Sequence, residues 1–220
     1  MSEPLIVRLS STTSTMADAA RLADQGAPHL SCVVADQQTA GQGRHGHSWL
    51  SPHGGLYVTF VLRPSATIPM LTLAIGLAVR EAVAVPCDLR WPNDLMVGDR
   101  KLAGILCTLQ NGAVLAGIGV NLSDPGHPEA AWLTGVSRDA LLVSLRRALP
   151  DFLNLDPASI LRLFTQYSSY ALGRRVHVEG HGLGITAGLD PAGFLLLQKD
   201  SGERVTIYAG GVRPAGDQTR

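Results

Sequence analysis

Apolar residues in the first part of the chain form short strand-like runs separated by longer stretches with helical spacing. Strands are expected where β-branched and aromatic residues concentrate, at residues 5–9, 32–35 and 56–62. Alanines and leucines recur with helical spacing after Thr13 or Ser14, either of which would cap a helix ending at Gly26. The most apolar stretch predicts a buried helix over residues 70–84.

Residues 88–122 read as a set of antiparallel strands. A polar break at Gly98-Asp99 separates two of them, and Asn111-Gly112 is the strongest hairpin signal in the chain. Two further stretches have helical spacing, residues 137–149 and 157–170. Ser137 would cap the first helix, and Asp156 would cap the second with Pro157 just inside it.

The sequence pattern changes from Gly173 onward, where short apolar runs alternate with clusters of turn-forming residues such as Asp190-Pro191-Ala192-Gly193. The runs are residues 176–178, 184–187, 194–197 and 205–208. Evenly spaced short strands predict a small barrel. We therefore expect two domains, residues 1–172 and residues 173–220.

Composition removes several classes of function. Lys plus Arg equals Asp plus Glu at 18 each, so the chain has no overall basic footprint for nucleic acid or anionic lipid. The segment 68–85 is interrupted by Arg80 and Glu81, which argues against a membrane span. The start of the chain has no signal-peptide pattern, and three cysteines without a C-x-x-C pair indicate reduced thiols. We expect a cytoplasmic protein.

The stretch 40–49, AGQGRHGHSW, combines three glycines with Arg44. Glycines let the backbone approach an anion closely, and an arginine adds a planar cation, which suits a phosphate or a carboxylate. The alternative is a flexible, solvated surface loop, because short glycine patterns also match by chance.

Three further motifs are each ambiguous alone. Asn93-Asp94 after Pro92 would present an amide and a carboxylate, but an Asn-Asp turn is the commoner fate of such a pair. Lys101 opens an apolar strand, where it is either a cation at a pocket rim or a solvated strand end. In 117–122, Asn121 follows two glycines that a closely passing backbone would also explain.

The order and spacing of these motifs resemble the biotin–protein ligase family. The resemblance rests on Ser14-Thr15-Met16, the glycine-rich stretch from Gln38 to Gly46, Trp91-Pro92-Asn93-Asp94, Lys101 to Leu106, and Gly117 to Asn121. It spans residues 5–125, and the tail segments GLDPAGFLLL and AGGV are similar to the small C-terminal barrel of that family. The resemblance implies an α/β (α+β) fold. It would comprise a mixed, largely antiparallel sheet flanked by helices, in a class II synthetase-like catalytic domain, plus an SH3-like barrel.

The same resemblance implies an ATP-dependent ligase that converts biotin to biotinyl-5′-AMP. The biotin would then pass to one lysine of the biotin carboxyl carrier domain of an acyl-CoA carboxylase. A carboxylate must attack the α-phosphorus of a polyanion, so cations near the reacting atoms carry the chemistry. One cation at about 4 Å contributes about 4 kcal/mol at an effective dielectric of roughly 20. No protein nucleophile is required, which agrees with the lack of any Ser/His/Asp or Cys/His constellation in the sequence.

The family also implies roles for individual residues. The catalytic residues would be Lys101, Arg44 and Asp94. Biotin would be bound by Ser14, Thr15, Gln38, Gly41, Gln42, Gly43, Arg44 and Lys101, with Ser14, Thr15 and Gln38 hydrogen-bonding its ureido ring. ATP would be bound by Arg44, His47, Trp49, Asn93, Asp94 and Asn121, with Trp49 packing on the adenine side. Mg²⁺ would be carried mainly by the ATP phosphates, with no protein ligands assigned.

Some relatives carry an N-terminal DNA-binding helix-turn-helix, but strand-like residues begin here by Leu5, so we expect no nucleic-acid partner. A monomer or weak homodimer with no membrane partner is expected. The alternatives are a lipoate or octanoate ligase or transferase of the same fold, and a non-catalytic biotin-binding module. The polar Ser-Thr and Gln38 positions favour a ureido ring over a plain acyl chain.

Two positions depart from the family pattern, which usually has arginine at Gln42 and often at His47. Gln42 supplies no charge and His47 is charged only part of the time near neutral pH, so we predict a loose hold on the adenylate. Gln42→Arg should slow adenylate release, measured as biotinyl-AMP appearing in solution during turnover without a carrier. Release as fast as from the parent chain would contradict this reading.

Overall fold

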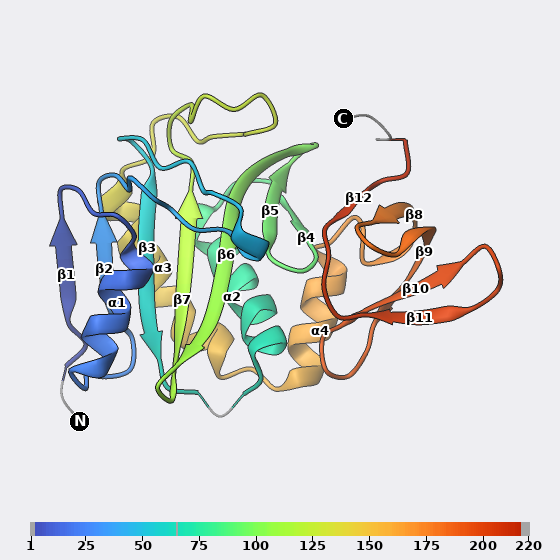
Figure 1. Ribbon diagram of the computed structural model, residues 1–220, viewed down its shortest axis with the longest axis horizontal. Helices are drawn as coiled ribbons and strands as arrows, with labels where there is room; N and C mark the ends of the chain where they lie inside the picture. The colour runs from blue at the N-terminus through green and yellow to red at the C-terminus, as the bar shows by residue number, and fades with distance from the viewer. Residues whose placement is uncertain (1–2, 65, 217–220) are drawn as a thin grey trace.

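The computed structural model describes residues 3–64 and 66–216 (Figure 1). Met1 and Ser2, part of the start that shows no signal-peptide pattern, lie outside it. The helices are α1 (Thr15–Asp24), α2 (Ile68–Val83), α3 (Arg138–Leu153) and α4 (Pro157–Gln166). The strands of the first sheet are β1 (Ile6–Leu9), β2 (Ser31–Ala35), β3 (Leu56–Leu62), β4 (Asp88–Arg90), β5 (Asp94–Val97), β6 (Arg100–Gln110) and β7 (Ala113–Val120). Those of the second are β8 (Leu172–Val178), β9 (Gly182–Leu189), β10 (Leu195–Lys199), β11 (Arg204–Ile207) and β12 (Val212–Pro214).

The first sheet has seven strands in the order β1-β2-β3-β7-β6-β5-β4. β1 pairs with β2 in parallel, and the other neighbours pair antiparallel. This confirms the mixed, largely antiparallel sheet expected from the sequence. β3, an inner strand next to the central β7, has all seven residues buried, because both faces of the sheet are covered there.

Helices cover the two faces unequally. Met16, Ala19 and Ala23 of α1 pack on one face against Val33 and Val61. On the opposite face, α2 and α3 pack side by side over a larger apolar core, as the depth of Figure 1 also shows. Of the helices in residues 3–64 and 66–216, none combines the length and apolar character required to cross a membrane.

The second sheet is antiparallel, in the order β11-β10-β9-β8-β12, and is consistent with the expected small SH3-like barrel. It is packed onto the first part of the chain. Val176, Leu195 and Leu197 belong to the same apolar core as α2 and α4. The indole Nε1 of Trp91 donates a hydrogen bond to the carbonyl oxygen of Gly193 at 3.0 Å. The two sheets are therefore joined by a continuous core.

Most predicted elements occur where the pattern indicates, but both later helices differ at their ends. α3 continues past Pro150 to Leu153, because Phe152 and Leu153 still pack on the core and outweigh the proline. α4 stops at Gln166 instead of Tyr170. The carbonyl of Tyr167 accepts the backbone N–H of Leu89 at 2.8 Å, which draws the chain out of the helix. β12 was not predicted, because its short run gives little signal.

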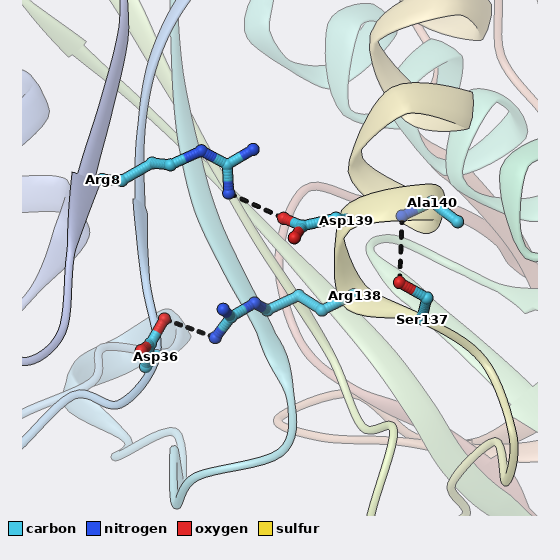
Figure 2. Close-up of polar contacts among 6 residues, drawn as sticks. All are labelled: Arg8, Asp36, Ser137, Arg138, Asp139 and Ala140. Atoms are coloured by element: carbon cyan, nitrogen blue, oxygen red, sulfur yellow. Dashed lines mark hydrogen bonds and ion pairs between the residues drawn. The ribbon is translucent and has the colours of Figure 1, made fainter.

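The N-terminus of α3 is tied to the edge of the first sheet by polar contacts (Figure 2). Arg8 of β1 pairs with Asp139 at 2.7 Å, and Arg138 pairs with Asp36 just after β2. Ser137 accepts the N–H of Ala140 at 3.4 Å, as the predicted cap should. The side chains of Arg8 and Asp139 are 54% and 63% exposed, so their pair contributes little to stability.

The core contact of α4 should matter far more than this surface pair. Phe164 is 1% exposed within the core, and Phe164→Ala should lower the free energy of unfolding by about 3–5 kcal/mol. Asp139→Ala should lower it by about 1 kcal/mol at most. Urea denaturation followed by circular dichroism measures both variants, and equal losses would contradict this division of the stability.

Candidate active site

A cavity of about 220 Å³ opens on the α1 side of the first sheet. Its walls come from the start of α1, the loop after β2, the start of β5, and strands β6 and β7. Figure 1 shows that loop crossing in front of the sheet as far as β6. Glu179, just after β8, and Gly211, just before β12, complete the lining. Segments distant in sequence thus converge on one site.

Glycines in the cavity floor make room for two large side chains. A Cβ at Gly119 would lie 2.4 Å from Nε1 of Trp49, and one at Gly117 would lie 2.8 Å from Sδ of Met16. Trp49 also lies over Gly104, where a Cβ would come within 3.0 Å of its ring. The glycines after Leu115 therefore accommodate side chains, not the passing backbone considered from the sequence.

The glycine-rich stretch forms a small hydrogen-bonded hairpin. The N–H of Trp49 donates to Gly41 at 2.9 Å, and the N–H of Gly43 donates to His47 at 2.7 Å. A Cβ at Gly41 would lie 2.4 Å from the carbonyl oxygen of Trp49, so the fold requires glycine there. The hairpin carries Arg44 into the cavity.

Two cations lie in the cavity beside the Asn93-Asp94 pair. Nη1 of Arg44 donates to Oδ1 of Asn93 at 3.3 Å. Nζ of Lys101 lies 2.6 Å from Oδ1 of Asp94 and 5.2 Å from the centre of the Trp49 ring. Burial lowers the pKa of Arg44, and the negative charges of Asp94 and Glu179 oppose that shift.

The backbone of Lys101 is held on both sides. Its N–H donates to Glu129 at 2.8 Å, and its carbonyl accepts the N–H of Ala131 at 2.9 Å. Asn121, 4% exposed, donates its side-chain amide to the carbonyls of Lys101 at 3.3 Å and Ala131 at 3.1 Å. Asn121 therefore lies behind the cavity and supports Lys101.

A buried polar network lies on the α1 side of the cavity. Oε1 of Gln38 accepts hydrogen bonds from the N–H of Thr15 at 2.8 Å and from its hydroxyl at 3.0 Å. Nε2 of Gln38 donates to Ser51 at 2.8 Å, and the hydroxyls of Thr15 and Thr59 are 2.9 Å apart. Ser14 is 3% exposed, and its hydroxyl has no hydrogen-bond partner within the described ranges. A buried hydroxyl of this kind gains energy from a ligand that bonds to it.

The cavity brings together most of the residues singled out from the sequence. Those lining it are Thr15, Gln38, Gln42, Gly43, Arg44, His47, Trp49, Asn93, Asp94 and Lys101. Ser14, Gly41 and Asn121 are buried just outside its wall.

Sequence reasoning missed four residues around the site. Thr59 stood out only as a polar residue in an apolar strand, and Ser51 only as a loop serine. Glu179 carried no local signal, and Gly211 stood out only within the tail segment AGGV, since only the tertiary fold brings them to the cavity.

Comparison with known proteins agrees with this geometry. Residues 6–123 match the biotin/lipoate A/B protein ligase family, and residues 171–212 match the biotin protein ligase C terminal domain. The bifunctional ligase/repressor BirA of Bacillus subtilis is 31% identical over 86% of this chain and 68% of its own length. The biotin–[acetyl-CoA-carboxylase] ligase of Mycobacterium tuberculosis is 32% identical over 92% of this chain and 86% of its own.

Among solved structures, the biotin protein ligase from Aquifex aeolicus in complex with biotin and ATP superposes with a TM-score of 0.83. It is 28% identical in sequence and covers 95% of this chain and 97% of its own. The order of motifs, the fold and these matches lead to one conclusion: the chain belongs to the biotin/lipoate A/B protein ligase family.

Proposed function

We propose that this protein is a biotin–protein ligase. It activates biotin with ATP as biotinyl-5′-AMP and transfers the biotin to a lysine of a biotin carboxyl carrier domain. The observation that carries this proposal is the pair of cations, Lys101 and Arg44, held next to Asn93 and Asp94 in one cavity. The similar Aquifex aeolicus ligase is described in complex with biotin and ATP, the two substrates proposed here.

In the first step an oxygen of the biotin carboxylate attacks the α-phosphorus of ATP, and pyrophosphate leaves. Two anions must approach each other, so the cations offset a repulsion that grows toward the transition state. Lys101 is 34% exposed and Arg44 is half-buried, where charges interact more strongly than in water. An arriving anion takes the place that Asp94 occupies beside Lys101.

For biotin, we propose a site between the Thr15–Gln38 network and the floor of the cavity. Met16 and Gly117 supply an apolar surface, and the hydroxyl of Ser14, which is buried behind the wall without a partner, would bond the ureido ring once biotin is seated. Oε1 of Gln38 accepts from Thr15 and one of its two amide hydrogens bonds Ser51, so Gln38 orients these two side chains, and we propose that its second amide hydrogen serves the ureido ring. A polar ring that pairs with a buried hydroxyl is preferred over an acyl chain that leaves it unpaired.

For ATP, we propose contacts with Arg44, His47, Asn93 and Asp94 on the opposite side of the cavity. The cavity is smaller than the roughly 300–1,000 Å³ of most ligand pockets and the Trp49 ring packs over Gly119, so we propose that this ring moves when both substrates bind. The displaced ring would then be free to pack on the adenine. The contact of Asn121 with the nucleotide stays a prediction. Its side-chain amide hydrogens already bind the backbone carbonyls of Lys101 and Ala131.

Mg²⁺ would be bound mainly by the ATP phosphates. The described residues hold no cluster of three or more His, Cys, Asp or Glu side chains able to coordinate a metal. Asp94 and Glu179 are the two carboxylates at the cavity. When bound with ATP, the ion would neutralise phosphate charge and leave the protein cations to act at the α-phosphorus.

In the second step the amine of the acceptor lysine attacks the carbonyl carbon of the mixed anhydride, and AMP leaves. Asp94 lies at the cavity, 24% exposed, and is the carboxylate placed to receive the incoming ammonium. We propose that the carrier domain belongs to an acyl-CoA carboxylase and that the ligase is a monomer or a weak homodimer. The three cysteines are free thiols, which supports the proposed cytoplasmic location.

The function is tested by incubating the chain with ATP, Mg²⁺, labelled biotin and a purified carrier domain. We expect label on one lysine of the carrier, and ATP–pyrophosphate exchange that depends on biotin. Lipoate and octanoate serve as competing acids in the exchange assay. Pyrophosphate exchange that depends on lipoate or octanoate instead of biotin would identify the chain as a lipoate or octanoate ligase. Tight binding of biotin with no exchange would indicate a non-catalytic module.

Lys101→Ala should slow adenylate formation by about 100- to 1,000-fold, because it removes one cation from the developing charge. Biotin-dependent pyrophosphate exchange measures this step without the carrier. Lys199, the only other lysine in the chain, lies in the second sheet, and Lys199→Ala is the matched control with an expected rate near that of the parent. A near-normal rate for Lys101→Ala would remove this lysine from the mechanism.

A further inference from the structure

A second hollow, which we call the side groove, opens next to the catalytic cavity and has a volume of about 160 Å³. One wall is formed by the start of α2, with Ile68, and by β6. The other wall comes from the second sheet, with Phe194 and Tyr208. Arg44 and Asn93 line both the side groove and the catalytic cavity, so the two spaces are neighbours across these side chains.

The two walls of the side groove are fixed relative to each other. The turn between β9 and β10 is held by the hydrogen bond from Trp91 to Gly193, and a Cβ at Gly193 would lie 3.1 Å from Leu73 of α2. The rings of Phe194 and Tyr208 pack edge to face with centres 4.9 Å apart. The groove is therefore a preformed feature of the packed sheets.

The lining indicates what kind of group fits. Arg44 is the one charged residue in it, and the remaining surface is mainly aliphatic and aromatic. Such a surface does not suit a phosphate chain or a sugar, which require several polar partners. Its volume is below that of most small-molecule sites, which leaves room for a side chain of a protein. Tyr208 is 68% exposed and presents an aromatic surface at the entrance.

We propose that the side groove receives an apolar side chain adjacent to the acceptor lysine of the carrier domain. This rests on the proposed function, which requires an acceptor lysine to reach Asp94. The residues beside that lysine must then lie over the surface around the cavity, and the side groove begins where Arg44 and Asn93 end the cavity wall. The second sheet would thereby take part in choosing the protein substrate.

The proposal separates the two half-reactions. Adenylate formation uses the catalytic cavity, whereas recognition of the carrier also uses the side groove. A small nucleophile such as hydroxylamine attacks the carbonyl carbon of biotinyl-AMP, releases AMP and forms biotin hydroxamate without needing the groove. Its rate therefore reports the state of the adenylate site alone.

The test uses Tyr208→Ser and Ile68→Ser, one on each wall, with Val143→Ser as a control on the exposed face of α3, where Val143 is 64% exposed. For both groove variants we expect the KM for the carrier domain to rise at least about tenfold, which corresponds to ~1.4 kcal/mol. Pyrophosphate exchange and hydroxamate formation should stay within about twofold of the parent, and this activity also shows that the variants are folded. Val143→Ser should leave all three measurements unchanged.

A matched change in the carrier tests the contact itself. Replacing the apolar residue nearest the acceptor lysine by serine should raise the KM of the parent ligase. It should add little to the effect of Tyr208→Ser, because both changes remove the same contact. Additive effects, or an unchanged KM for the carrier in both groove variants, would overturn the proposal.

The remaining outcomes also decide the matter. A rise in the KM for ATP or biotin would assign the side groove to the small substrates and overturn its role in carrier recognition. Absence of biotin-dependent exchange in the parent chain would instead refute the proposed function, and this inference with it. The exchange assay of the parent thus distinguishes the two failures.

Discussion

The whole site depends on placing two positive charges, Lys101 and Arg44, in the wall of one half-buried cavity before any anion has arrived. Lys101 and Arg44 would repel each other there, and burial alone disfavours a charged arginine. Asp94 relieves both problems, since it lies 2.6 Å from Lys101 and its charge also favours protonated Arg44. In the free protein the Asp94 carboxylate therefore supplies the negative charge that the substrates would supply in the complex.

The support for this arrangement extends well outside the cavity. Lys101 is fixed through its backbone by the segment at 129–131 and by Asn121, so its position follows from the end of β7 as much as from β6. The segments next to β8 and β12 add Glu179 and Gly211 to the cavity, and the second sheet shares a core with α2 and α4. The site therefore depends on residues beyond the segment 6–123.

The sequence was sufficient for those features that depend on local pattern. The apolar, β-rich run at 56–62 predicted β3, and Asn111-Gly112 located the β6–β7 hairpin. The resemblance of the ordered motifs to the biotin–protein ligase family indicated a set of site residues, and most of them line the cavity. Features that depend on tertiary contacts were not accessible. No local rule places the Trp49 ring over Gly119 or turns the Asn121 amide toward backbone carbonyls, and the packing that carries α3 past Pro150 is equally non-local.

The ion pair of Lys101 with Asp94 also bears on whether the enzyme acylates its own lysine. A reactive acyl group formed in this cavity would lie close to a lysine, the very side chain that such groups modify. A protonated lysine has three donors and no electron pair to offer, so Lys101 is a poor nucleophile when paired with an anion, whether with Asp94 at 2.6 Å in the free protein or with the adenylate phosphate that would replace it. Most other cations of the chain are arginines, with Lys199 the one further lysine. The arrangement that makes Lys101 useful as a charge thus also protects it from self-acylation.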